Sequence, residues 1–155
     1  MKKKIKLDKH FLHFIKLCNQ QEVKYLIIGG YAVGFHGHPR MTKDLDVCIE
    51  TTEENAKKMV VVIHEFGFKS LGLTKDDFTR KNFISQLGYD LNRIDIINGI
   101  DEIAFADAWK EKMVITIEDV PVNFVSLEHL ILLKKMAGRP QDLADLHKLI
   151  KRKKK

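Results

Sequence analysis

Hydrophobic and polar residues alternate along this chain with two different periods, which predict a mixture of helices and strands. Apolar residues recur every three or four positions in segments that predict helices at 8–21, 31–38, 52–66, 101–109, 126–137 and 141–152. Short apolar or alternating runs between them predict strands at 24–28, 44–50, 83–87, 93–97, 114–117 and 122–124. The pattern favours an α+β (α/β-like) fold, with a mixed β-sheet flanked by helices and a C-terminal helical pair.

The alternation at 44–50 places two carboxylates on one face of a predicted strand. Leu45 and Val47 point into a core, so Asp44 and Asp46 point together to the other side. Two like charges this close repel each other, and burial raises their pKa values unless a cation is shared between them. Mg²⁺ (or Mn²⁺) suits such a carboxylate pair together with substrate phosphates. An exposed Asp-Leu-Asp that binds nothing is the alternative that the motif alone leaves open.

The surrounding residues favour a phosphate and metal site. Gly29 and Gly30 end the apolar strand at 24–28, and glycines there allow a sharp turn whose N–H groups approach a ligand. Asp95 alternates with buried isoleucines on a second predicted strand and supplies a third carboxylate. Three acids on adjacent strands are typical of a two-metal site for in-line phosphoryl displacement. Arg40 precedes Asp44 by four residues, within reach of a triphosphate or of the acids, although a solvated loop arginine is the alternative.

The spacing of these residues resembles a known superfamily. Gly29-Gly30, then thirteen residues, then Asp44-Leu45-Asp46, with Asp95 on a later strand, resembles the nucleotidyltransferase fold of the DNA polymerase beta superfamily. More narrowly, "GGYAVGFHGHPRMTKDLDV" and "LLKKMAGRPQDLADL" are similar to minimal nucleotidyltransferases of the AbiEii toxin type. The resemblance implies that Asp44, Asp46 and Asp95 are metal ligands and catalytic acids. It also implies that Gly29 and Gly30 shape the phosphate turn, although many superfamily members have Gly-Ser there.

The late block adds three candidate nucleotide-binding residues. Lys134 continues the apolar stripe of its predicted helix, which predicts that it leans inward toward phosphate, while a snorkelling lysine is the alternative. The resemblance places a functional lysine in this block and aligns Arg139 and Asp142 with its "R-P-x-D" portion. A local ion pair at a helix start is the alternative for these two residues.

Length, composition and charge agree with one domain over residues 1–155. The chain is 45% hydrophobic and 31% charged, its longest aliphatic run (59–63) is too short to cross a bilayer, and no apolar signal core follows the N-terminal lysines. Two cysteines without metal-type spacing favour reduced thiols, and so a cytoplasmic protein. Basic tails lie at about 1–6 and 151–155, and residues 2–4 and 151–155 alone carry eight positive charges, so the rest of the +6 chain carries −2. A nucleic-acid acceptor is therefore permitted but not required.

The sequence thus predicts a Mg²⁺-dependent enzyme that moves a nucleoside monophosphate from an NTP to a hydroxyl acceptor. The AbiEii-like features imply a toxin-like activity on tRNA or protein, with a cognate antitoxin or a second copy as a further partner. A small antibiotic-modifying nucleotidyltransferase is the enzymatic alternative, because it shares the same site. A non-catalytic antitoxin or regulatory module is the second alternative, although clustered acids without a metal are costly.

Overall fold

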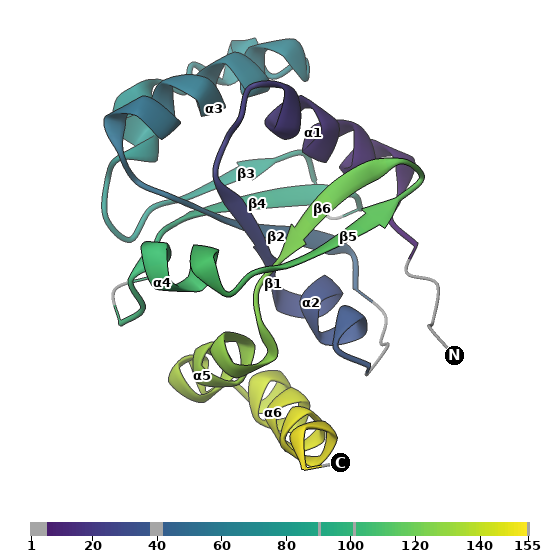
Figure 1. The fold of residues 1–155 in the computed structure, drawn as a ribbon. Coiled ribbons are helices and arrows are strands. Elements are labelled where there is room, and N and C mark those ends of the chain that lie inside the picture. The colour runs from purple at the N-terminus through teal and green to yellow at the C-terminus, as the bar shows by residue number, and fades with distance from the viewer. Residues whose placement is uncertain (1–5, 38–41, 90, 101, 155) are drawn as a thin grey trace.

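A six-stranded mixed sheet forms the centre of the molecule in the computed structural model, which describes residues 6–37, 42–89, 91–100 and 102–154. The strand order is β3-β4-β2-β1-β6-β5 (Figure 1). β2 is antiparallel to β1 and parallel to β4, β1 is parallel to β6, and the β3–β4 and β5–β6 pairs are antiparallel. The strands are β1 (Tyr25–Ile28), β2 (Asp44–Ile49), β3 (Ile84–Leu87), β4 (Arg93–Asn98), β5 (Met113–Ile117) and β6 (Val120–Phe124).

In the described part of the chain, six α-helices and two short 3₁₀ turns connect and cover these strands. Three of the described helices begin at side-chain caps: the side chains of Asp8, Thr52 and Ser126 accept hydrogen bonds from the first turns of α1, α3 and α5. The helices are α1 (Lys9–Gln20), α2 (Gly29–Phe35), α3 (Glu53–Glu65), α4 (Phe105–Lys110), α5 (Leu127–Ala137) and α6 (Pro140–Lys153), and the 3₁₀ turns are η1 (Lys69–Leu71) and η2 (Lys75–Phe78).

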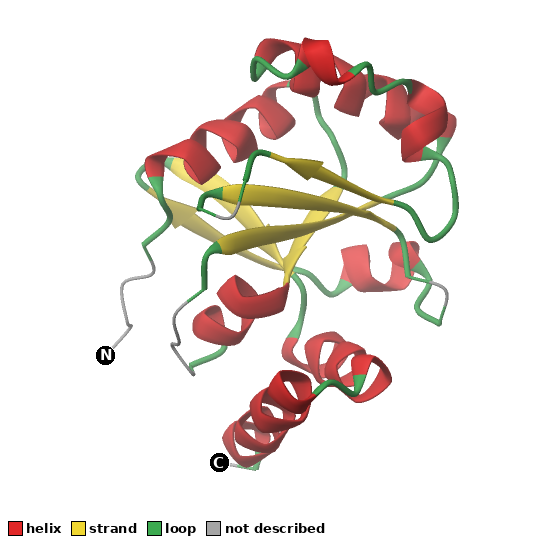
Figure 2. Cartoon of the chain, turned by 180° about the vertical axis from the view of Figure 1, so that it is seen from behind, coloured by secondary structure: helices red, strands yellow, loops and turns green. Residues whose placement is uncertain are grey.

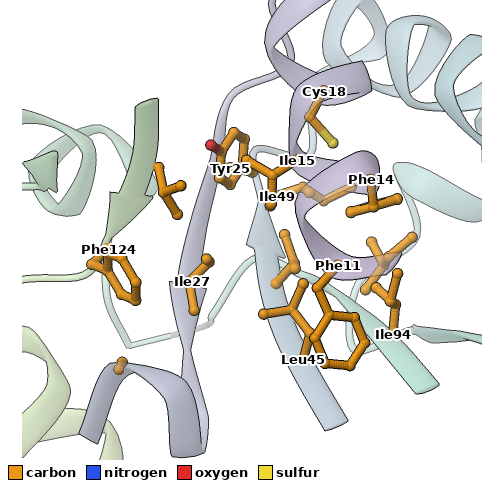
Figure 3. Packing of buried hydrophobic residues seen from close by; sticks show 14 of the residues in the cluster. Phe11, Phe14, Ile15, Cys18, Tyr25, Ile27, Leu45, Ile49, Ile94 and Phe124 are labelled. Carbon is orange, nitrogen blue, oxygen red and sulfur yellow. The ribbon is translucent and has the colours of Figure 1, made fainter. Parts of the chain in front are cut away.

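The two faces of the sheet have different roles. Helices α1 and α3 cover one face, whereas α2, α4, α5 and α6 lie on the other side (Figures 1 and 2). Phe11 and Phe14 of α1 pack toward Leu45 of β2 and Ile94 of β4 in a fully buried core (Figure 3). Because successive strand residues alternate in direction, the acidic residues of β2 and β4 face the second side.

The predicted mixed sheet with flanking helices and a C-terminal helical pair is confirmed. The helix α2 begins at Gly29 itself, two residues earlier than the sequence pattern predicts, because Gly29 adopts a left-handed φ of +71° and turns the end of β1 directly into the helix. The short helix predicted from residue 101 begins only at Phe105. Within the described ranges, no helix combines the length and the apolar character needed to cross a bilayer.

Candidate active site

Strands β2 and β4 bring the predicted acids together at one end of the sheet. In the parallel register of these strands, Asp46 lies opposite Asp95 and Asp44 lies opposite Arg93. On the other side of β2, Asp46 lies opposite Ile28, the last residue of β1, so Gly29 follows directly beside it. The structure therefore places all three acids and the first glycine at one point, as the sequence predicts.

Gly29 touches the carboxylate of Asp46 so closely that no side chain fits between them. A Cβ atom at this position would overlap Oδ2 of Asp46 and lie 2.9 Å from its Cγ. Gly30 lies in a different environment. A Cβ there would lie 2.7 Å from Oγ1 of Thr42, a residue of the segment that leads into β2. Gly29 thus shapes the acidic site, whereas Gly30 lets α2 pack against the entry to β2.

Replacing Gly29 with Ala is expected to lower the free energy of unfolding by about 1–3 kcal/mol, since it adds a positive-φ penalty to a steric clash with Asp46. Gly34→Ala is the matched control, because Gly34 lies in the same helix and a Cβ there meets nothing within 4 Å. That control should be neutral or stabilise the protein by about 0.5–1 kcal/mol. Urea unfolding of both variants measures the difference, and equal effects would contradict the close approach.

The surroundings of Asp46 perturb its ionisation. Burial, followed by the charges of Asp95 and Asp44, raises its pKa to about 7, although the charges of Lys134 and Arg139 act in the opposite direction. Among the described residues, none donates a hydrogen bond to its carboxylate or forms an ion pair with it. Asp46 is therefore a partly buried acid that lacks a direct cationic partner within the described chain.

Arg93 bridges the other two acids. Its Nε donates to Oδ1 of Asp95 at 2.8 Å, and one Nη donates both to Oδ2 of Asp95 at 3.1 Å and to Oδ2 of Asp44 at 2.9 Å. All three side chains are at least two-thirds buried, so these charge-assisted bonds fix the positions of the two carboxylates. Arg93 is not among the site residues predicted from the sequence. The signal was available, because Arg93 lies two positions before Asp95 on the same strand face.

The carboxylate oxygens at this site are chemically suited to binding a hard divalent cation. Carboxylate oxygens are the preferred protein ligands of Mg²⁺, which commonly binds one or two of them and completes its shell with phosphate and water. Asp46 presents such oxygens next to the glycine turn and opposite Asp95. Within the described residues, however, no group of three His, Cys, Asp or Glu side chains is already arranged as a metal centre. Arg93 is the group that holds Asp44 and Asp95 together.

A second polar cluster lies on the C-terminal helices α5 and α6. Lys134 is buried, and its Nζ lies 3.0 Å from a carboxylate oxygen of Asp142 and 3.0 Å from one of Asp145. Arg139 donates its backbone N–H and its Nε to Asp142, while its own side chain remains 77% exposed. Burial raises the pKa of Asp142, but the hydrogen bonds and charges of Arg139 and Lys134 outweigh it and hold that pKa below its usual value.

This cluster changes the interpretation of the late block. Lys134 does lean inward, as its position on the apolar stripe predicts, but its charge is shared between two buried carboxylates. Asp145 was missed by the sequence analysis, although it follows Asp142 by three residues and therefore lies on the same helix face. Both Lys134 and Arg139 act on the pKa of Asp46, so the cluster lies within electrostatic range of the acids. Arg40 lies outside the described residues.

Lys134→Met is expected to destabilise the protein by about 3 kcal/mol, because it leaves Asp142 and Asp145 buried with one cation removed. Lys135→Met on the same helix is the matched control, since Lys135 is exposed, and it should change stability by less than about 0.5 kcal/mol. Chemical denaturation of the two variants checks this prediction. A Lys134 variant as stable as its control would show that the two ion pairs contribute nothing to stability.

Comparison with known proteins gives one family and a set of related folds. The family profile described as "Nucleotidyltransferase of unknown function (DUF6036)" matches residues 5–152, which is nearly the whole chain. No curated protein matches the sequence at a significant level.

Three solved structures have a similar fold. A "putative nucleotidyltransferase" from Thermotoga maritima is 17% identical, with a TM-score of 0.59 over 89% of this chain and 88% of that one. The lincosamide antibiotic adenylyltransferase LnuA, bound to lincomycin, is 14% identical, with a TM-score of 0.56 over 92% and 96% of the two chains. ANT(2")-Ia in complex with adenylyl-2"-tobramycin is 15% identical, with a TM-score of 0.53 over 90% and 84%. The fold is that of the nucleotidyltransferases.

Proposed function

Because the chain belongs to the DUF6036 family of nucleotidyltransferases, we propose that it transfers a nucleoside monophosphate from an NTP to a hydroxyl acceptor and releases pyrophosphate. The observation that carries this proposal is the position of Asp46. Its carboxylate lies against Gly29 and opposite Asp95, without a hydrogen-bond donor among the described residues. A partly buried carboxylate without a hydrogen-bond donor is costly, and a cation delivered with the nucleotide would relieve that cost.

In this proposal Asp44, Asp46 and Asp95 hold Mg²⁺ or Mn²⁺, and the ion supplies charge neutralisation at the phosphates. The chain's own groups do the remaining work. Gly29 keeps the backbone close to the acids, so that the triphosphate can approach them without a side chain in between. Arg93 keeps the Asp95 carboxylate oriented through two hydrogen bonds.

The proposed reaction is an in-line displacement at the α-phosphorus. The acceptor oxygen forms a bond to this atom, while the bond from the α-phosphorus to the oxygen bridging toward the β-phosphorus breaks. Pyrophosphate leaves with the electron pair of the broken bond. The proton of the acceptor hydroxyl passes to the Asp95 carboxylate, which acts as the general base. Arg139, with most of its side chain exposed, is the better candidate than Lys134 for a contact with the phosphates.

Two acceptor classes follow from different observations. The resemblance of the glycine and late blocks to AbiEii-type toxins supports tRNA or a protein as the acceptor. The fold similarity to LnuA and ANT(2")-Ia supports an antibiotic hydroxyl, since those structures contain lincomycin and adenylyl-2"-tobramycin. Both acceptors require the same acids and the same reaction, so they differ only in what approaches Asp95.

The test is a labelling experiment with each α-³²P-labelled NTP and Mg²⁺. Total tRNA, total cell protein, a lincosamide and an aminoglycoside are supplied separately as acceptors. We expect label on one acceptor class with the wild type and none with Asp46→Asn. Calorimetric titration with a non-hydrolysable NTP analogue and Mg²⁺ completes the test. A protein that binds no nucleotide and labels no acceptor would be a non-catalytic module, and the proposed function would be wrong.

A further inference from the structure

The turn between β3 and β4 carries two unusually exposed large side chains. Tyr89 is 90% exposed and Leu91 is 72% exposed, the two highest values among the large hydrophobic residues of the described chain. Gly88 and Asn92, on either side of this pair, adopt positive φ angles of +94° and +63°. Hairpin turns ordinarily carry glycine and small polar residues, so a tyrosine displayed at this point is notable.

The position of this turn relates it to the acidic site. Arg93, which binds Asp44 and Asp95, is the first residue of β4 and follows the turn directly. β2 and β4 are parallel, with Asp44 opposite Arg93, so both strands begin at the sheet end where the β3–β4 turn lies (Figure 1). The turn therefore borders the site on the β4 side, where Asp95 is located.

This side of the site is also open on the sheet surface. Gln86 of β3 lies opposite Asp95 in the antiparallel register and is exposed, and Ile84 on the same face is 52% exposed. Gly29 lies on the opposite side of β2, next to β1. A triphosphate seated near Gly29 thus leaves the β3–β4 side for the acceptor hydroxyl.

The three tyrosines of the chain differ sharply in the availability of their hydroxyls. Tyr25 is fully buried, its hydroxyl bonds Asn19 and the carbonyl of Pro121, and burial raises its pKa above the ordinary range. Tyr31 is half-buried against the ring of Phe11, and burial likewise raises its pKa. Only Tyr89 presents its phenol freely to solvent.

We propose that Tyr89 is a self-modification site: the enzyme transfers a nucleoside monophosphate to the Tyr89 hydroxyl, in the same chain or in a second copy. This inference rests on the proposed nucleotidyltransferase activity. The phenolic oxygen forms the new bond to the α-phosphorus, and the bond to the bridging oxygen of the β-phosphorus breaks, releasing pyrophosphate. The phenolic proton passes to the Asp95 carboxylate. The product is a nucleotidylated tyrosine, in which a phosphodiester joins the Tyr89 oxygen to the nucleoside.

The experiment uses the full chain, Mg²⁺ and each α-³²P-labelled NTP, without any added acceptor. Trypsin releases residues 82–93 as one peptide, whose only side-chain hydroxyls are those of Tyr89 and Ser85. Ser85 is buried, so modification of the folded protein is directed to Tyr89. We expect this peptide to gain the mass of one nucleoside monophosphate. Tyr89→Phe and Asp46→Asn should each lose the label, whereas the matched control Tyr31→Phe should keep it.

Two results would overturn the inference while leaving the proposed function intact. One is nucleotide and Mg²⁺ binding by calorimetry with no label on the 82–93 peptide. The other is label that persists in Tyr89→Phe, which is expected to fold normally because this side chain contacts little of the protein. A protein that neither binds nucleotide nor gains label would overturn both the inference and the proposed function.

Discussion

Asp46→Asn is expected to abolish nucleotidyl transfer and, in the same protein, to raise its stability above pH 7. The loss of transfer should be at least about 10³-fold, since a carboxylate that holds the metal and its phosphates contributes several kcal/mol to the transition state. The gain in stability follows from burial of the Asp46 charge beside Asp95 and Asp44, which raises its pKa to about 7.

The pH dependence has a definite sign. The folded protein keeps the Asp46 proton up to about pH 7, whereas the unfolded chain loses it near 3.8. The folded state therefore binds more protons in this window, and the free energy of unfolding falls as the pH rises through it. The pKa shift of Asp46 corresponds to a loss of at most about 4 kcal/mol in the free energy of unfolding at high pH. We expect the Asn variant to recover roughly 1–3 kcal/mol of this loss.

Thermal unfolding at about pH 5 and about pH 8 measures this effect, with Asp44→Asn as the matched control. Asp44 accepts a hydrogen bond from Arg93 at 2.9 Å, so its neutralisation should leave stability unchanged or lower it. Addition of Mg²⁺ should raise the melting temperature of the wild type but not that of Asp46→Asn. An Asp46 variant that is less stable than the wild type at the higher pH would contradict a partly buried carboxylate that has no cationic partner among the described residues.

Most of the strands and helices follow from local patterns. The alternation of residues 44–50 and 93–97 predicts both acid-bearing strands, which form at Asp44–Ile49 and Arg93–Asn98, because one face of each is completely buried. Side-chain caps at Asp8, Thr52 and Ser126 mark three helix starts, because each cap needs only residues within the same turn. The start of α2 is less predictable, since Gly29 begins the helix directly after Ile28, the last residue of β1, with no connecting loop between them.

The contacts that complete the site depend on residues far apart in the chain. The bond from Arg93 to Asp44 joins residues 49 positions apart, and it exists only because β2 and β4 pair in one particular register. The burial of Lys134 follows from its own helix, but its partners Asp142 and Asp145 come from the next helix. Periodicity predicts which way a side chain points, whereas its partner is set by how the elements pack.

The second large effect is expected at Arg93, which we assign as a positioning residue for the acids. Arg93→Gln removes three charge-assisted hydrogen bonds, so Asp44 and Asp95 lose both their orientation and their shared counter-charge. We expect a fall of about 10²-fold in kcat/KM and a loss of about 1–2 kcal/mol in stability. Arg93→Lys keeps the charge but not the bidentate geometry, so it should recover stability better than activity.

A measurement of the pH profile separates positioning from a merely structural role. Removal of the Arg93 charge leaves three carboxylates facing one another, which raises the pKa of Asp46 further. The acid limb of the activity profile should therefore move to higher pH in Arg93→Gln and much less in Arg93→Lys. Arg80→Gln is the control, because its ion pair with Asp77 is long, at 3.5 Å, and the Arg80 side chain is 58% exposed, so its removal should change neither activity nor the profile. An unshifted profile in Arg93→Gln, with activity lost only in proportion to unfolding, would mean that Arg93 stabilises the sheet end without orienting the acids.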